Sequence, residues 1–275
     1  MRLIAALLSV SLTLGAFAQP GDGQPQAQPR GDQPSAELSI QPVNPKAIPV
    51  PDGPVVKREE KENGLIIEDI KIGEGYEIKP GGAIVAHYHG TLRTDGSVFD
   101  SSFERGEPAA FPLTNVIQGW QQGVPGMKVG GVRRLIIPAA LAYGEQSPSP
   151  KIPANSDLVF IIQAVDALQI EDVSEGEGEA AEGQFVAVTA HSVKDAEGKV
   201  IEEHSKQSPY IWLPGEFQGI TYALEGMKPG GKRKVRIPAQ MNQSHPMAQT
   251  QRPQNVPLEI ELELIAVRNL NPPRR

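Results

Sequence analysis

Aromatic and apolar side chains at regular intervals are the residues of this chain most suited to forming a binding pocket. In the stretch 116–139, four apolar residues recur at short spacings: Val116, Ile117, Trp120 and Val124. Such spacing places them on one face of a short helix. A helix that shows one large aromatic ring beside a sheet can form the floor of a pocket. The expected chemistry is therefore the enclosure of an apolar ligand group.

The rest of this stretch predicts the elements that hold the helix in place. Gly130 and Gly131 are expected to supply the positive backbone angles of a reversing turn. The following run, Arg133–Ile137, stops at Pro138 and is typical of a strand. Upstream, residues 83–89 predict another strand. The helix should therefore lie beside a sheet.

Two histidines of the strand at 83–89 are candidate metal ligands. In a strand, His87 and His89 point to one face and Tyr88 points to the other. If Tyr88 faces the pocket, both histidines face away from it. A third ligand at a suitable spacing is missing, and the sequence has no Cys. We therefore expect no metal and no cofactor; a metal-dependent enzyme built on scattered histidines is the alternative, and loss of activity in a chelator would support it.

The stretch 65–168 resembles the FKBP-type peptidyl-prolyl cis-trans isomerases. The resemblance rests on motif blocks that occur in family order. They are Ala-His-Tyr-His-Gly at 86–90, Asp-Gly-x-x-Phe-Asp-Ser-Ser at 95–102, Val-Ile-x-Gly-Trp at 116–120, Gly-Met-x-x-Gly at 126–130, Ala-Tyr-Gly at 142–144 and Ile-Pro-x-x-Ser-x-Leu-Val-Phe at 152–160. The resemblance implies an α+β fold in which an antiparallel sheet wraps around a short helix.

The implied activity needs neither a nucleophile nor a cofactor. Rotation about an X-Pro amide must break the resonance of its C–N bond, against a barrier of about 18–20 kcal/mol. The twisted amide is less polar than the planar one. A dry aromatic pocket that grips the proline ring therefore favours the transition state by differential binding.

The resemblance also implies a role for each residue of the site. It places Trp120 under the proline ring, with Tyr143 donating its hydroxyl to a substrate carbonyl. Asp100 would lie beside the reacting carbonyl, held by Tyr88 and Arg105, because an unpaired buried carboxylate is costly. The implied catalytic residues are Tyr88, Phe99, Asp100, Trp120, Tyr143 and Phe160. The implied substrate-binding residues are Arg105, Val116, Ile117, Ala142 and Ile152.

Two departures from the family pattern border the expected pocket. Ala109 stands where the family usually has an aromatic residue, which would open the pocket on that side, although Phe111 two residues later matches a framework aromatic of the family. The loop 145–153 carries three prolines and overhangs the pocket. Sequence preference and the binding of macrolides, a ligand class implied by the resemblance, depend on these two features.

A second copy of the fold follows the first at a shift of 100 residues. Residues 126–139 and 226–239 are identical at nine of fourteen positions, as expected for an internal repeat. The copies differ where the pocket would lie. In this register Ile220 replaces Trp120, Gln243 replaces Tyr143, Ile260 replaces Phe160, Glu202 replaces Asp100, and no aromatic residue in 186–190 replaces Tyr88. We expect a non-catalytic scaffold or interaction domain; a different ligand held by Phe217 is the alternative.

Composition and charge set the remaining boundaries. We expect a signal peptide at 1–18, a disordered tether rich in Pro, Gln and Gly at 19–61, and an isomerase domain at 62–170. An acidic Gly-rich linker at 171–183 and the second domain at 184–270 follow. An uncleaved membrane anchor is the alternative to the signal peptide, although its apolar part is shorter than the roughly 20 residues that span a bilayer. The net charge of −7 argues against nucleic-acid binding.

Together these observations predict an exported isomerase, periplasmic or secreted, that assists the folding of proline-containing proteins. Its expected partners are unfolded or nascent exported chains, macrolide ligands and a second copy of itself in a homodimer. No membrane span is expected after signal cleavage. The rival hypothesis is a non-catalytic chaperone or peptide-binding module on the same fold, which would bind prolines without turnover.

Overall fold

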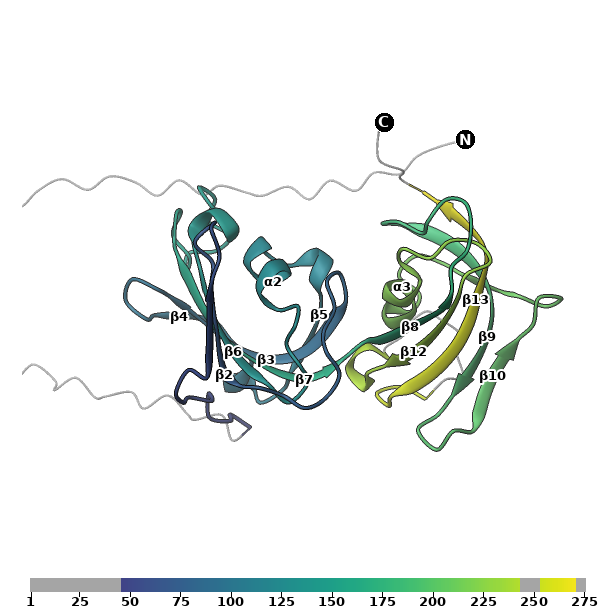
Figure 1. The fold of residues 1–275 in the computed structure, drawn as a ribbon, viewed down its shortest axis with the longest axis horizontal. Coiled ribbons are helices and arrows are strands. Elements are labelled where there is room, and N and C mark those ends of the chain that lie inside the picture. Colours follow the sequence, from purple (N-terminus) through teal and green to yellow (C-terminus); the bar gives the residue numbers. More distant parts are fainter. Residues whose placement is uncertain (1–45, 243–252, 271–275) are drawn as a thin grey trace, which may run out of the picture. The chain divides into compact units, whose positions relative to one another are not determined.

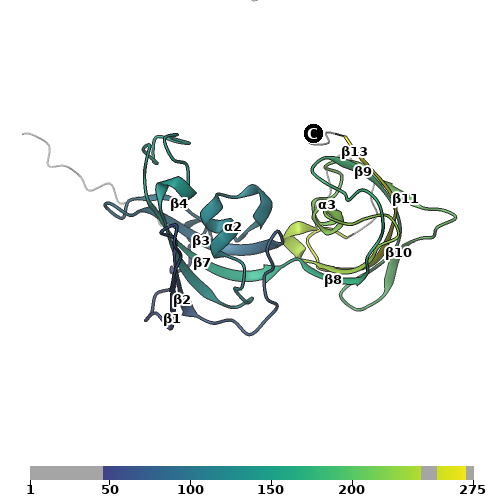
Figure 2. The same ribbon diagram turned by 45° about the horizontal axis from the view of Figure 1, so that its top comes forward.

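The computed structural model describes residues 46–242 and 253–270. The expected signal peptide, most of the expected tether and Gln243 lie outside these residues. Two sheets, each built from antiparallel strand pairs, curve around one short helix each (Figures 1 and 2). This architecture confirms the predicted α+β class. No helix within the described ranges is long and apolar enough to cross a membrane.

The first sheet has the strand order β1-β2-β6-β7-β3-β4, and β5 pairs with β3. Its strands are β1 (Lys57–Glu60), β2 (Ile66–Lys71), β3 (Ala83–Leu92), β4 (Val98–Ser101), β5 (Ala109–Pro112), β6 (Val132–Ile137) and β7 (Leu158–Ala167). Its helical segments are α1 (Ser102–Arg105), α2 (Gln118–Gly123) and the 3-10 turns η1 (Leu113–Asn115) and η2 (Ala139–Leu141).

Alternating side chains on β7 and a glycine on α2 bring the helix onto the sheet. Leu158, Phe160 and Ile162 point into the core, and the residues between them are half-buried. A Cβ atom at Gly119 would lie 2.4 Å from a methyl carbon of Ile137 on β6. Only glycine permits this approach, so Gly119 sets how closely α2 lies against the sheet. The fixed helix then presents Trp120 to the core.

The second sheet repeats this plan with the order β10-β9-β13-β12-β8, and β11 pairs with β9. Its strands are β8 (Gln169–Ser174), β9 (Phe185–Lys194), β10 (Val200–His204), β11 (Tyr210–Trp212), β12 (Lys232–Ile237) and β13 (Leu258–Asn269). Its helical segments are α3 (Gln218–Leu224) and the 3-10 turn η3 (Ala239–Met241). The strands β8 to β13 correspond one by one, in chain order and in pairing, to β2 to β7, and α3 corresponds to α2. The repeat inferred from the sequence is therefore a second copy of the fold.

The predicted tether extends too far toward the C-terminus. Its last residues include β1, which pairs with β2 and places Arg58 opposite Glu68. The chain is also attached before β1, because the N–H of Ile48 donates to the carbonyl oxygen of Phe103 at 3.0 Å. β1 is an edge strand with every residue exposed, so its sequence carries no hydrophobic period that would identify it.

The predicted linker at 171–183 is also wrong, because these residues belong to the second domain. Glu171 and Asp172 lie in β8, paired with Lys234 and Arg233 of β12. Further on, the fully buried Ala181 exchanges backbone hydrogen bonds with residues 226 and 227. The acidic residues that suggested a linker lie opposite basic residues of the neighbouring strand β12. The second domain therefore begins at β8.

The reversing turn before β6 uses only one of its two glycines as expected. Gly130 has φ of +87°, whereas Gly131 is not among the described glycines with positive φ. A Cβ atom on Gly131 would instead lie 2.9 Å from the carbonyl oxygen of Lys128. Close backbone approach, rather than a left-handed conformation, accounts for the second glycine.

Candidate functional site

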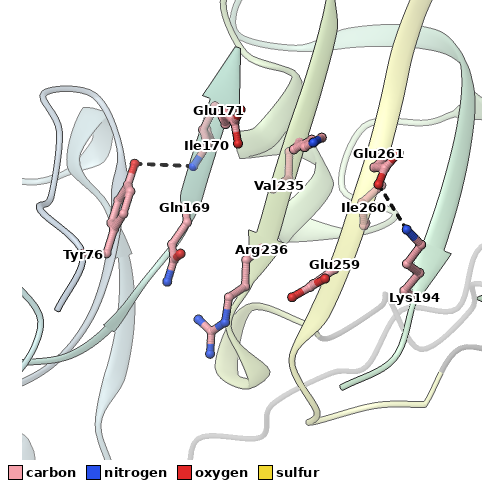
Figure 3. A pocket seen from close by; sticks show the side chains of 11 residues that line it. Tyr76, Gln169, Ile170, Glu171, Lys194, Val235, Arg236, Glu259, Ile260 and Glu261 are labelled. Atoms are coloured by element: carbon pink, nitrogen blue, oxygen red, sulfur yellow. Dashed lines mark hydrogen bonds and ion pairs between the residues drawn. The ribbon is translucent and has the colours of Figure 1, made fainter. Parts of the chain in front are cut away.

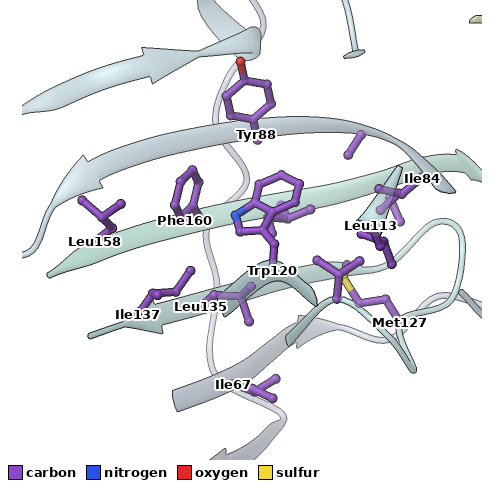
Figure 4. Close-up of a cluster of buried hydrophobic side chains, with 14 of the residues drawn as sticks. Ile67, Ile84, Tyr88, Leu113, Trp120, Met127, Leu135, Ile137, Leu158 and Phe160 are labelled. Atoms are coloured by element: carbon purple, nitrogen blue, oxygen red, sulfur yellow. The ribbon is translucent and has the colours of Figure 1, made fainter. Parts of the chain in front are cut away.

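The ring of Trp120 forms the floor of an aromatic cup. This residue is only 4% exposed. Its ring centroid lies 5.2 Å from that of Phe111, 5.3 Å from that of Phe160 and 6.1 Å from that of Tyr88, all in edge-to-face geometry. Figure 4 shows Tyr88 and Phe160 rising from neighbouring strands beside the indole. Each such pair adds about 0.5–1.5 kcal/mol beyond burial, so the cup is preorganised.

The cup opens into a pocket of about 670 Å³, a volume typical of small-ligand sites. Most of the residues predicted for the site line it. They are Tyr88, Phe99, Asp100, Val116, Ile117, Trp120, Tyr143, Ile152 and Phe160. Two predicted residues do not. Arg105 reaches the site through Asp100 and Tyr88, and Ala142 packs, partly buried, against the hydrophobic core.

Four lining residues were not predicted. They are Phe111, Asn115, Pro148 and Ser149. Phe111 lies on β5, two residues after Ala109 and therefore on the same side of the strand. The two-residue spacing from Ala109 could have indicated that Phe111 faces the pocket. However, β5 is only four residues long, which is too short for its partner strand to be inferred from the sequence. Phe111 supplies an aromatic wall close to the place that Ala109 leaves open.

The carboxylate of Asp100 is held by two donors. The Tyr88 hydroxyl donates to one oxygen, and Arg105 Nη1 donates to the other. Arg105 Nη2 also donates to the Tyr88 hydroxyl at 2.7 Å, which closes a triangle. Burial alone would raise the pKa of the Asp100 carboxyl, but the hydrogen bonds from Tyr88 and Arg105 together lower it below its usual value. Burial, reinforced by Asp100, raises the pKa of Tyr88. The site therefore presents an ionised carboxylate and a neutral phenol at neutral pH.

Three further donors belong to pocket-lining residues. The Tyr143 side chain follows η2 and is 39% exposed. Ile117 is the N-cap of α2, so its backbone N–H precedes the hydrogen-bond ladder of the helix. The indole N–H of Trp120 is buried and has no hydrogen-bond partner among the described residues. Of these groups, the Tyr143 hydroxyl and the Ile117 N–H can donate a hydrogen bond to a peptide carbonyl oxygen in the pocket.

The two histidines of β3 lie away from the cup, as the alternation predicts. His87 is buried, with Nδ1 3.2 Å from Ser102 Oγ and its ring stacked on Phe103 at 5.0 Å. Burial lowers the pKa of His87, which favours a neutral ring. His89 Nδ1 lies 3.1 Å from Ser101 Oγ. Each ring therefore contacts a serine hydroxyl on the far side of the sheet from the pocket.

Gly90 makes room for two walls of the cup. The rings of Phe99 and Phe160 meet edge to face at 5.5 Å. A Cβ atom at Gly90 would lie 2.5 Å from Phe99 and 3.0 Å from Phe160. Real Cβ atoms essentially never come as close as 2.5 Å, so any larger residue here must displace the aromatic pair. The cup requires glycine at this position.

Strand pairing gives the corresponding residues of the second domain. Tyr88 pairs with Ile162 in the first sheet, and His191 pairs with Leu262 in the second. Since Ile162 and Leu262 occupy equivalent positions of the repeat, His191 stands where Tyr88 stands. The expectation that no ring replaces Tyr88 was therefore wrong. It assumed one constant shift, whereas β9 lies three residues further along than a shift of 100 predicts.

The other replacements remove the cup. By the same pairing, Val193 stands for Gly90 and Glu202 for Asp100. The floor and wall positions hold Ile220 and Ile260, which are buried in the core of the second domain together with Val193. The described part of the second domain therefore has aliphatic residues in place of Gly90 and of the rings of Trp120 and Phe160.

A separate pocket lies against the second sheet, and charged side chains make up more than half of its lining residues (Figure 3). Its side chains come mainly from β8, β12 and β13 and include Lys234, Arg236, Glu259 and Glu261. Lys194 donates to Glu261 at 3.1 Å across it. Because its lining is mostly charged and comes from other strands than those of the cup, this pocket is not the counterpart of the aromatic cup.

Comparison with known proteins agrees with this geometry. The family profile described as "FKBP-type peptidyl-prolyl cis-trans isomerase" matches residues 75–165 and again residues 176–265. A "Probable FK506-binding protein" of Corynebacterium glutamicum is 48% identical over 103 residues, which make up 38% of this chain and 86% of that relative.

Two other relatives share a smaller part of their length. A "Peptidyl-prolyl cis-trans isomerase" of Saccharomyces cerevisiae is 44% identical over 131 residues, or 47% of this chain and 31% of the relative. The "FKBP-type peptidyl-prolyl cis-trans isomerase FkpA" of Escherichia coli is 44% identical over 103 residues, or 38% of this chain and 37% of the relative. The chain thus spans about a third of these two proteins. Because the family profile matches both domains, the chain belongs to the FKBP-type peptidyl-prolyl cis-trans isomerase family.

Proposed function

We propose that the first domain isomerises X-Pro bonds of exported, unfolded proteins and that the second domain does not catalyse this reaction. The observation that carries the proposal is the aromatic pocket of the first domain, with Trp120 at its floor and Asp100 fixed at its rim. The second domain supports the division of labour, because Ile220 and Ile260 stand at the equivalent floor and wall positions.

The pocket suits a reaction in which an amide twists and no other bond changes. A twisted amide loses conjugation and becomes less polar, so it enters an apolar recess at a lower desolvation cost than the planar form. The cup grips the proline ring in both states, but only the twisted state gains from the dry surroundings. This difference lowers the barrier of about 18–20 kcal/mol.

The polar groups of the site orient the substrate. Tyr143 and the Ile117 N–H donate to carbonyl oxygens on either side of the proline. Asp100 keeps the Tyr88 hydroxyl turned toward itself, so that the substrate meets the ring of Tyr88 rather than a mobile phenol. Such fixed positioning reduces the reorganisation needed at the moment of rotation.

Substitution of Asp100 tests this account. Asp100→Asn keeps the size of the side chain but removes the charge that holds Tyr88 and Arg105. We expect kcat/KM for a proline-containing fluorogenic peptide to fall about tenfold, equivalent to ~1.4 kcal/mol of transition-state stabilisation. Glu107→Gln, which alters an exposed carboxylate paired with Lys46, is the control and should leave kcat/KM unchanged. Equal rates for Asp100→Asn and the wild type would remove Asp100 from the mechanism.

The same assay separates the isomerase from the rival chaperone or peptide-binding module. Both would bind a proline peptide, but only an isomerase accelerates the cis-to-trans phase. Binding by the folded wild-type chain without any acceleration would replace the isomerase proposal with the binding module.

Export rests on the sequence alone. We expect the chain to be cleaved after Ala18, so that the mature protein begins at Gln19. Mass spectrometry of the protein recovered from producing cells checks this. An intact N-terminus on the accumulated protein would contradict export by signal cleavage.

A further inference from the structure

Three potential metal ligands meet in the second domain. His191 lies on β9, and Glu202 and His204 lie on the neighbouring strand β10. His204 pairs directly with His191 across the two strands, and Glu202 is two residues before His204. Residues two apart on a strand share a face, so the sheet itself brings all three side chains together.

The ligand atoms converge on one point. Glu202 Oε1 lies 3.0 Å from His191 Nε2 and 3.4 Å from His204 Nε2. One ligand atom from each of the three residues lies within 4.8 Å of the others. Zinc bonds of about 2.0–2.2 Å in a tetrahedron place ligand atoms roughly 3.3 Å apart. Two of the three separations are therefore close to those around a tetrahedral zinc ion.

Buried partners orient the ring of His191. Its Nδ1 lies 2.9 Å from Thr189 Oγ1, which also accepts a 2.8 Å hydrogen bond from the indole N–H of Trp212. Thr189 and Trp212 are both buried. A hydrogen bond at one ring nitrogen fixes the orientation of the ring and leaves the other nitrogen to coordinate, as is usual for histidines that bind metals. Here the nitrogen that remains is Nε2, which faces Glu202.

The cluster is also open on one side. The side chain of His191 is 1% exposed, whereas those of Glu202 and His204 are 17% and 27% exposed. An ion can therefore enter beside His204 and keep a water molecule as its fourth ligand. Two imidazoles and one carboxylate form a donor set that zinc uses in proteins.

We propose that the second domain binds one Zn²⁺ ion through His191 Nε2, Glu202 and His204 Nε2. His191 and Glu202 stand where Tyr88 and Asp100 stand in the first domain, so the hydrogen-bonded pair of the isomerase pocket is replaced by a pair of metal ligands. The ion joins β9 to β10 and stabilises the second domain by binding its folded form. The expectation of no metal rested on His87 and His89, which lie in the first domain.

Zinc titration of the untagged full-length chain, first dialysed against a chelator, tests the proposal. Isothermal calorimetry should give one equivalent of bound Zn²⁺. Glu202→Gln and His204→Ala should each weaken binding at least tenfold, because each removes a ligand while changing a partly exposed side chain. His89→Ala and His245→Ala are the controls and should bind as the wild type does. Absence of binding, or binding that survives both ligand substitutions, would overturn the proposal.

A second measurement uses only the wild-type chain, so its result does not depend on whether a variant folds. Carbethoxylation of the wild-type chain by diethylpyrocarbonate, mapped by peptide mass spectrometry, should be at least tenfold slower at His204 when one equivalent of Zn²⁺ is present. The rate at His89 should not change. Equal rates at His204 with and without Zn²⁺ would overturn the proposal even if a variant proved to be unfolded.

Discussion

Replacing Gly90 with valine should lower kcat/KM of the isomerase roughly a hundredfold, because displacement of groups in an active site by about 1 Å costs on this order. The new side chain would start within 2.5 Å of Phe99 and 3.0 Å of Phe160. Both rings must then move away from the cup. The same overpacking should reduce the stability of the first domain by about 1–3 kcal/mol. Peptide isomerisation and urea unfolding of the full chain measure the two effects.

The second domain supplies a matched control for this substitution. There Val193 stands for Gly90, and Ile201 and Ile260 stand for the two phenylalanines. These residues pack together in or against the second core. The triple variant Gly90→Val, Phe99→Ile and Phe160→Ile should therefore regain most of the lost stability but none of the activity. Recovery of activity together with stability would show that the two rings are framework rather than site.

Replacing Asp69 with alanine should cost the first domain about 3–5 kcal/mol of unfolding free energy, because it leaves a buried guanidinium without its partner. Arg133 Nε and Nη2 donate to the two oxygens of Asp69 at 2.7 and 3.2 Å. The two side chains are 7% and 11% exposed. Arg133 Nη1 also donates to the carbonyl oxygen of Gly123 at the end of α2. The loss should therefore loosen the helix that carries Trp120.

In the equivalent pair of the second domain the carboxylate is exposed, and this pair serves as the control. Arg233 Nε donates to Asp172 at 2.6 Å; the Arg233 side chain is 11% exposed, but that of Asp172 is 60% exposed. Water screens this pair, so Asp172→Ala should cost less than about 1 kcal/mol. The chain has two tryptophans, one in each domain, and a Trp212→Phe background leaves Trp120 to report the unfolding of the first domain. Similar losses for the two alanine variants would show that burial does not set the strength of this ion pair.

The aromatic site was largely predictable because its residues occupy short motifs of fixed spacing. Trp120 lies on an amphipathic helix, and Tyr88 alternates with two histidines on a strand, so each side chain could be assigned a direction from local periodicity. The pairing of Asp100 with Tyr88 and Arg105 was implied by the family resemblance, and it agrees with the need of a carboxylate near an apolar pocket for partners. Phe111 was interpreted only as a framework aromatic, because its place in the pocket depends on the pairing of β5 with β3, which no local pattern encodes.

The wrong bounds of the tether and the linker, and the wrong counterpart of Tyr88, have one physical origin. Each depends on strand pairing that is exposed to solvent or irregular in register. β1 and β8 are rich in charged residues, and their partners lie elsewhere in the chain, so their sequences resemble a tether and a linker. His191 lies opposite Leu262 because the offset between the two copies of the repeat differs from strand to strand. An alignment of the two copies that uses one constant shift of 100 residues cannot reproduce this pairing. The zinc ligands were overlooked for the same reason, since Glu202 and His204 meet His191 only in the observed register.

Comparison of the full-length wild type with the triple variant Gly90→Val, Phe99→Ile and Phe160→Ile tests the central claim most directly. The measurement is the rate of cis-to-trans isomerisation of a fluorogenic proline peptide, with folding of both proteins checked by circular dichroism. We expect the wild type to accelerate the reaction and the folded triple variant to leave it near the uncatalysed rate. Equal acceleration by both proteins would contradict the assignment of catalysis to the aromatic cup of the first domain.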